Sequence, residues 1–241
     1  PSEWSNIADW SMGLLCPSDW KAQWIGNRED IFPDSTLTFP APYFRKEFVV
    51  AKPIKKAMAY VCGLGFYEMY FNGERVGEQV LAPAVTNYDR RSLKKLLYHY
   101  DDQSTQRVFY NVFDVTGNLK MQNNAIGIIL GNGWYNQRDR TVEGHMWYDV
   151  PKMILQLEIE YEDGTKEMIV SDKTTTGPLL HDAIFTGEIY DARKDLGHWN
   201  RESYDDNIWE SALQVRPPTG TLMFQTIPFN KVMQIVDTHF E

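Results

Sequence analysis

The chain has 241 residues, with 33 Asp and Glu against 24 Lys and Arg, so its formal net charge is −9. This acidic balance argues against a nucleic-acid partner, because phosphates require a basic patch. No stretch approaches the ~20 apolar residues of a membrane-spanning helix, which argues against a membrane protein. Aromatic residues make up 14% of the chain, and such large side chains typically fill the interior of a β-sandwich.

Strand signals recur along most of the chain after a Trp-rich lead-in. Residues 1–26 carry four Trp, whose indoles are expected to pack on a larger body. Alternating or apolar runs predict strands over 43–50, 57–62, 66–71, 74–81, 108–115, 125–130, 153–161, 166–171, 221–226 and 229–236. Residues 90–106 are expected to form a polar, basic excursion between strands. Residues 177–210 carry Gly, Pro and Asp punctuation and show little helical periodicity.

Two hairpins are predicted from turn chemistry. Asn72-Gly73 follows an aromatic run, and both residues tolerate the positive φ of a type I′ turn. Residues 162–165 similarly join two alternating runs. With more than ten strand signals and no sustained helix, the sequence predicts an all-β fold: an antiparallel β-sandwich, with a jelly roll fitting the strand number.

The two cysteines, Cys16 and Cys62, leave their redox state open. A disulfide is conceivable in an oxidising compartment, but two separate small apolar residues are the favoured interpretation. Cys62 lies in an apolar run that favours a buried thiol.

The loop over 132–151 is the best candidate for a ligand site. It is too aromatic to be disordered, and long irregular loops in compact domains tend to be functional. Rings that stack on sugar faces and polar groups that bind hydroxyls point to carbohydrate binding. The candidate residues, including one from the loop over 84–90, are Asn87, Asn132, Trp134, Tyr135, Arg138, His145 and Trp147. The rings would equally suit plugging one end of the sandwich or packing on a neighbouring domain.

A second candidate is the loop around Asn87 and Asp89. Their oxygens could ligate a hard cation such as calcium, although an Asx turn is the simpler and favoured interpretation. Acidic pairs such as Asp139 with Glu143, or Glu188 with Asp191, could in principle serve a glycosidase. Solvated surface carboxylates are the favoured alternative. No serine-nucleophile or dinucleotide-binding motif is present, so no catalytic residue is predicted.

An ordered series of short motifs runs through nearly the whole chain. The matching pieces are residues 20–26, 44–48, 63–77, 81–88, 114–116, 124–127, 130–135, 156–165, 187–193 and 206–212. Together they resemble the N-terminal, non-catalytic β-sandwich region of bacterial α-L-rhamnosidases, a large family of inverting glycoside hydrolases. Two departures are the missing Trp in 171–176 and a longer link over 91–109.

The resemblance implies a galactose-binding-like jelly roll over 20–228, with its core in 54–200. Residues 1–19 would lead in from a preceding Ig-like domain, and 229–241 would begin a linker to a catalytic (α/α)6 domain. The implied function is accessory. The module would bind a rhamnose-containing glycan, with calcium as a possible partner and no required cofactor, inside a periplasmic or secreted enzyme that degrades polysaccharides.

The same resemblance implies that the isolated module is inactive, because the catalytic carboxylates of the family lie in the helical domain. Sugar binding would use stacking on Trp134 or Trp147, with hydroxyls held by Asn87, Asn132 and Arg138. The competing hypothesis is a structural spacer that docks on the catalytic domain and binds no sugar.

Overall fold

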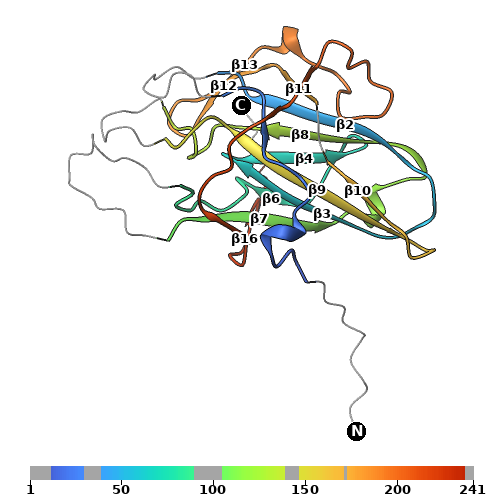
Figure 1. The fold of residues 1–241 in the computed structure, drawn as a ribbon. Coiled ribbons are helices and arrows are strands. Elements are labelled where there is room, and N and C mark those ends of the chain that lie inside the picture. Colours follow the sequence, from blue (N-terminus) through green and yellow to red (C-terminus); the bar gives the residue numbers. More distant parts are fainter. Residues whose placement is uncertain (1–11, 30–38, 90–104, 139–146, 171–172, 237–241) are drawn as a thin grey trace.

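Two β-sheets packed face to face form the body of the protein (Figure 1). A computed structural model describes residues 12–29, 39–89, 105–138, 147–170 and 173–236. Sheet one has the order β15 (Leu213–Gln214), β1 (Ile25–Gly26), β9 (Lys152–Tyr161), β3 (Ile54–Leu64), β7 (Arg107–Asp114) and β16 (Thr221–Phe224), with β10 (Lys166–Ile169) also on β9. Sheet two has the order β14 (Glu210–Ser211), β11 (Lys173–Thr176), β2 (Pro42–Val50), β8 (Gln122–Leu130), β4 (Tyr67–Phe71) and β5 (Glu74–Arg75).

Two further two-stranded sheets complete the described fold. β12 (Leu179–Ala183) pairs with β13 (Gly187–Tyr190), and β6 (Gln79–Val80) pairs with β17 (Asn230–Lys231). The helical elements of the described residues are short 3-10 turns at Pro17–Asp19, Thr116–Asn118 and Ala192–Lys194. The named strands pair antiparallel except β16, which runs parallel to β7. The predicted all-β antiparallel sandwich is therefore confirmed.

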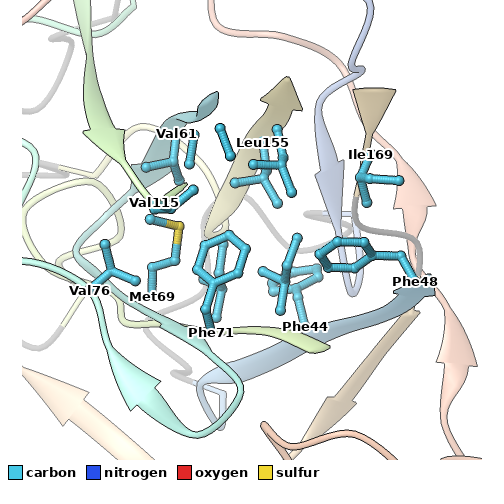
Figure 2. Packing of buried hydrophobic residues seen from close by; sticks show 14 of the residues in the cluster. Phe44, Phe48, Val61, Met69, Phe71, Val76, Val115, Leu155 and Ile169 are labelled. Atoms are coloured by element: carbon cyan, nitrogen blue, oxygen red, sulfur yellow. The ribbon is translucent and has the colours of Figure 1, made fainter. Parts of the chain in front are cut away.

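The core lies between the inner faces of the two sheets. In β4, Tyr67, Met69 and Phe71 are buried while the residues between them are partly exposed, as the period-two geometry of a strand requires. Figure 2 shows Met69 and Phe71 of sheet two facing Val61 and Leu155 of sheet one. Burying each such side chain stabilises the fold by roughly 1.5–3 kcal/mol.

The hairpin predicted at Asn72-Gly73 is confirmed. Asn72 has φ of 52° and Gly73 has φ of 88°, the two positive values that a type I′ turn needs. The Asn72 side chain also donates to the Asn118 carbonyl at 2.9 Å and accepts from the Ala125 amide at 2.9 Å. The turn is therefore tied to β8 as well as to its own strands.

Three predictions of elements were wrong in part. The run over 74–81 is interrupted at Gly77, whose φ of 77° ends β5 before β6 begins. The run over 229–236 holds only the two-residue strand β17 in the described residues. The stretch over 177–210, in which no strand was predicted, contains the β12–β13 hairpin. Its second strand is wholly exposed, so it carries no pattern of buried and exposed positions. The predicted excursion over 90–106 lies almost wholly outside the described residues.

The Trp-rich lead-in packs on sheet one, as expected for its described part. The Trp20 ring lies edge-on to Tyr110 at 5.3 Å, and Trp24 is buried. The Tyr110 hydroxyl donates to the Leu14 carbonyl at 2.9 Å. Cys16 is exposed and Cys62 buried, both as free thiols. The predicted domain limits stay predictions.

Arg45 fixes the long segment after β13 to sheet two. Its guanidinium is 1% exposed and forms an ion pair with Asp206. It also donates to the carbonyls of Trp199 and Arg201, each at 2.9 Å, and to Glu47 at 2.6 Å. A buried cation is tolerated here because its donors are satisfied.

The Asp206 carboxyl predicts an acid-sensitive contribution to stability. Burial tends to raise its pKa, but hydrogen bonds from Lys173 and Arg45 outweigh burial and lower it below the usual value. A carboxyl with a lowered folded pKa stabilises the fold above its unfolded pKa of about 4 and loses that contribution as pH falls through the folded value. The free energy of unfolding, measured in urea, should fall more steeply between pH 5 and pH 2 in the wild type than in Asp206→Asn. Equal slopes would contradict this.

Candidate functional site

A cleft of about 470 Å³ opens at the end of sheet two where β2 and β4 begin and β8 ends. The β12–β13 hairpin forms a wall of the cleft with Asp182, Glu188 and Tyr190, and β4 contributes Glu68 to the lining. Gly131 and Gly133, in the loop after β8, also line the cleft. We call this space the hairpin cleft.

The backbone after β8 approaches its neighbours so closely that glycine is required. A Cβ on Gly131 would lie 2.8 Å from the Asp182 carboxylate. Gly133 has φ of 48°, and a Cβ there would lie 2.9 Å from the Phe66 ring. Glycine at 131 therefore lets the loop approach the hairpin, and glycine at 133 lets it approach Phe66 between β3 and β4.

Asn132 locks the hairpin in place. Its backbone amide donates to Asp182 Oδ2 at 2.6 Å, and its side-chain amide donates to Asp182 Oδ1 at 2.8 Å and to the Asp182 carbonyl at 3.1 Å. Both residues are at most 9% exposed. This buried set of hydrogen bonds joins residues that are 50 positions apart in the chain.

The hairpin cleft carries a concentration of negative charge. Asp182 lies directly opposite Glu188 in the β12–β13 register, and side chains of such a pair lie on one face about 5 Å apart. Burial raises the pKa of the Asp182 carboxyl; the hydrogen bonds from Asn132 oppose this rise, and the Glu188 charge adds to it. Burial first, and then Tyr190, Asp195, Glu188 and Glu68, raise the pKa of Tyr43 to about 12. Both shifts have the direction that a negative local potential gives.

Positive groups near the cleft are already paired. The Arg75 guanidinium lies 3.4 Å from Glu68, which also accepts from the Tyr70 hydroxyl. His181 bonds to Thr186 at 2.9 Å. Among the described residues that line the cleft there is no Lys, Arg or His.

Four of the predicted sugar-binding residues are buried. Beyond its bonds to Asp182, Asn132 accepts from Asn136 at 2.6 Å, and Asn136 in turn accepts from Arg138 at 2.6 Å. The Arg138 guanidinium lies over the Trp147 ring, 5.0 Å from its centre, and these side chains are 2% and 6% exposed. In this conformation the covered Trp147 face is not open to a sugar. These residues support the loop from inside.

The remaining predicted residues differ in exposure. Tyr135, the fourth buried residue, is stacked on Tyr148 at 5.7 Å and edge-on to Tyr88 at 5.4 Å. It too offers no free face. Trp134 is 37% exposed and lies edge-on to Phe185 of the hairpin turn at 5.6 Å, so stacking on its ring stays a prediction. His145 lies outside the described residues, as does the acidic pair at positions 139 and 143.

The proposed calcium ligands have protein partners. Asn87 Oδ1 accepts from the Tyr148 hydroxyl at 2.8 Å. Asp89 accepts from the Thr219 hydroxyl and lies 3.8 Å from Arg216. Calcium takes six to eight oxygen ligands, and the described residues contain no group of three or more Asp, Glu, His or Cys that could hold a metal. Calcium binding therefore stays a prediction.

Sequence reasoning missed the acidic wall of the cleft. Glu188 stood out only in a possible pair with Asp191, whereas Asp191 bonds to Arg193 at 2.8 Å. The true neighbour of Glu188 is Asp182, which only the hairpin register reveals. The sequence signal that could have indicated this hairpin is Gly187, because glycine is common where a hairpin turns.

The two layers and the cleft define a class of protein, the galactose-binding-like antiparallel β-sandwich. Among the described residues no helix has the length and apolar character to cross a membrane. The family model described as the alpha-L-rhamnosidase N-terminal domain matches residues 52–234. The chain therefore belongs to the α-L-rhamnosidase N-terminal domain family, as the ordered motifs predicted.

Relatives of the chain are much longer proteins. An alpha-L-rhamnosidase of Formosa agariphila is 34% identical over 97% of this chain, which covers 25% of that protein. The structure of alpha-L-rhamnosidase from Dictyoglumus thermophilum matches 90% of this chain at 42% identity and a TM-score of 0.71, and 23% of that chain is covered. The Streptomyces avermitilis alpha-L-rhamnosidase complexed with L-rhamnose matches 82% of this chain at 29% identity and a TM-score of 0.70, with 18% of that chain covered. The chain spans a quarter or less of these relatives.

Proposed function

We propose that this chain is the non-catalytic accessory β-sandwich of an α-L-rhamnosidase and that it binds a terminal rhamnose in the hairpin cleft. The observation that carries the proposal is the cleft itself. Its volume of about 470 Å³ falls in the usual range for small-molecule sites, about 300–1,000 Å³. The relatives are rhamnosidases in which this domain is one part of a longer chain, and hydrolysis by the whole protein is part of the proposal.

The lining suits a sugar with an apolar side. Phe66, Leu81 and Ile184 offer carbon surface to the methyl group and C–H face of a deoxyhexose. Asp182 and Glu188 offer carboxylate oxygens that accept hydrogen bonds from ring hydroxyls. Asn132 keeps Asp182 oriented and so acts as a positioning residue.

A second candidate function is docking onto the rest of the enzyme. Exposed apolar side chains outside the cleft favour it: Ile208 is 86% exposed, Met233 90% and Ile235 85%. Single exposed apolar residues are common, but two of these lie in one short segment of the chain. Docking and sugar binding would use different surfaces, so the two functions are compatible.

Titration of the domain with L-rhamnose tests the proposal. We expect heat of binding with a millimolar dissociation constant, because a monosaccharide offers few atoms to contact. Tyr190→Ala, which removes a lining ring, should weaken binding about tenfold. Ile189→Ala is the matched control, since Ile189 is exposed on the same strand but does not line the cleft. Absence of heat at tens of millimolar sugar, with and without added calcium, would overturn sugar binding.

A further inference from the structure

We propose that the hairpin cleft selects neutral sugars and rejects those that carry a carboxylate or sulfate, because Asp182, Glu188 and Glu68 line it without a basic side chain among its described lining residues. This inference rests on the proposed sugar site and adds the charge class of its ligand. It concerns a specificity that the family membership does not supply.

The two negative charges of the hairpin, on Asp182 and Glu188, lie on one face of it. Asp182 cannot turn away from the cleft, because Asn132 holds both of its carboxylate oxygens. Glu188 stands opposite it in register, on the same face of the hairpin. Like charges placed directly opposite on neighbouring strands are destabilising, so this pair disfavours a third negative charge beside it.

No Lys or Arg among the described lining residues offsets the Asp182–Glu188 pair. Arg75 pairs with Glu68 at 3.4 Å, and His181, next to Asp182 in the chain, is the basic side chain that acts on the Asp182 carboxyl. The protein as a whole carries a net charge of −9, which adds repulsion of anions at long range. The raised pKa of Tyr43, caused by burial and then by neighbours that include Glu188 and Glu68, agrees with this sign.

Neutral and anionic sugars differ in the hydrogen bonds that they can form with these carboxylates. Hydroxyl groups can donate to carboxylates, whereas a ligand carboxylate or sulfate can only accept hydrogen bonds at neutral pH. Beside Asp182 and Glu188, a ligand anion would therefore place acceptor against acceptor, whereas a ligand hydroxyl can donate to either carboxylate. Two unit charges about 5 Å apart repel by about 1 kcal/mol in water and more in a partly buried site. A neutral 6-deoxyhexose avoids this conflict and places its methyl group on the apolar wall.

Three sugars that differ only at carbon 6 test the inference: L-rhamnose with a methyl group, L-mannose with a hydroxymethyl group and L-mannuronate with a carboxylate. We expect L-mannuronate to bind the domain at least about tenfold more weakly than L-mannose at low salt. The difference should shrink in 1 M NaCl, which screens charges over about 3 Å. Affinities are measured by calorimetry or by ligand-observed NMR.

Glu188→Gln keeps the size of the side chain and removes one charge. It should narrow the preference for L-mannose over L-mannuronate by at least about threefold. Glu162→Gln, in the exposed turn between β9 and β10, is the matched control and should leave the preference unchanged. Equal binding of the two sugars by the wild type, or an unchanged preference in Glu188→Gln, overturns the inference and leaves the sugar site standing. Failure of all three sugars to bind overturns the sugar site and the inference with it.

Discussion

Replacement of Arg45 by Met should lower the free energy of unfolding by about 3–5 kcal/mol, the usual cost of removing one partner from a buried ion pair. The change removes the buried cation from Asp206, which keeps only its pair with Lys173 at 2.6 Å. It also removes the donors to the Trp199 and Arg201 carbonyls. Met fills a similar volume, so lost polar contacts rather than a cavity determine the result. Urea denaturation followed by tryptophan fluorescence measures the effect.

An exposed ion pair provides the control for Arg45. Lys52 lies 2.7 Å from Asp163, and these side chains are 44% and 50% exposed. Lys52→Met should therefore cost less than about 1 kcal/mol, since solvent screens the pair. If Arg45→Met proves as mild as Lys52→Met, then Arg45 does not hold the segment after β13 on sheet two.

The β4–β5 hairpin was predictable from sequence because its signals are local. The alternation in β4 and the Asn72-Gly73 turn occupy a few consecutive residues. Each of these residues favours the local backbone conformation that it adopts in the fold. The same reasoning gave the β9–β10 hairpin. A sandwich followed from many such local signals, each agreeing with the others.

The hairpin cleft was not predictable from the same signals. Asp182 acquires its role from Asn132, which is 50 residues earlier, and from a register with Glu188 in a strand that has no buried face. The loop after β8 was singled out for its aromatic and polar side chains. Apart from Trp134, the predicted residues that the structure describes in this loop are nevertheless buried, and Asn132, Asn136 and Arg138 bond to one another. Composition shows which side chains are present but not which way they face.

Exchange of the two locking residues should reveal how much the cleft depends on them. Asn132→Asp places a second carboxylate against buried Asp182 and should cost about 3 kcal/mol or more. Asp182→Asn turns one acceptor into a donor facing the Asn132 amide groups, at a cost of about 1–3 kcal/mol. In the double variant the new amide at position 182 can donate to the new carboxylate at position 132, while its remaining oxygen accepts from the backbone amide. The carboxylate at position 132 can still accept from Asn136.

The double variant should therefore be more stable than the sum of the single changes allows, by at least about 2 kcal/mol. Residues in one hydrogen-bond network commonly couple by about 0.5–3 kcal/mol, whereas distant sites add within about 0.5 kcal/mol. The control is a double variant of two distant residues, Asn132→Asp with Asp163→Asn. Asp163 lies in the exposed turn after β9, so the effects of these two substitutions should add. Additive losses in the Asn132–Asp182 exchange would mean that other contacts, such as the backbone hydrogen bond from Ala41 to Leu179, hold the hairpin. Coupling that appears only in this pair would show that one polar contact sets the position of the acidic wall, and with it the charge that a bound sugar meets.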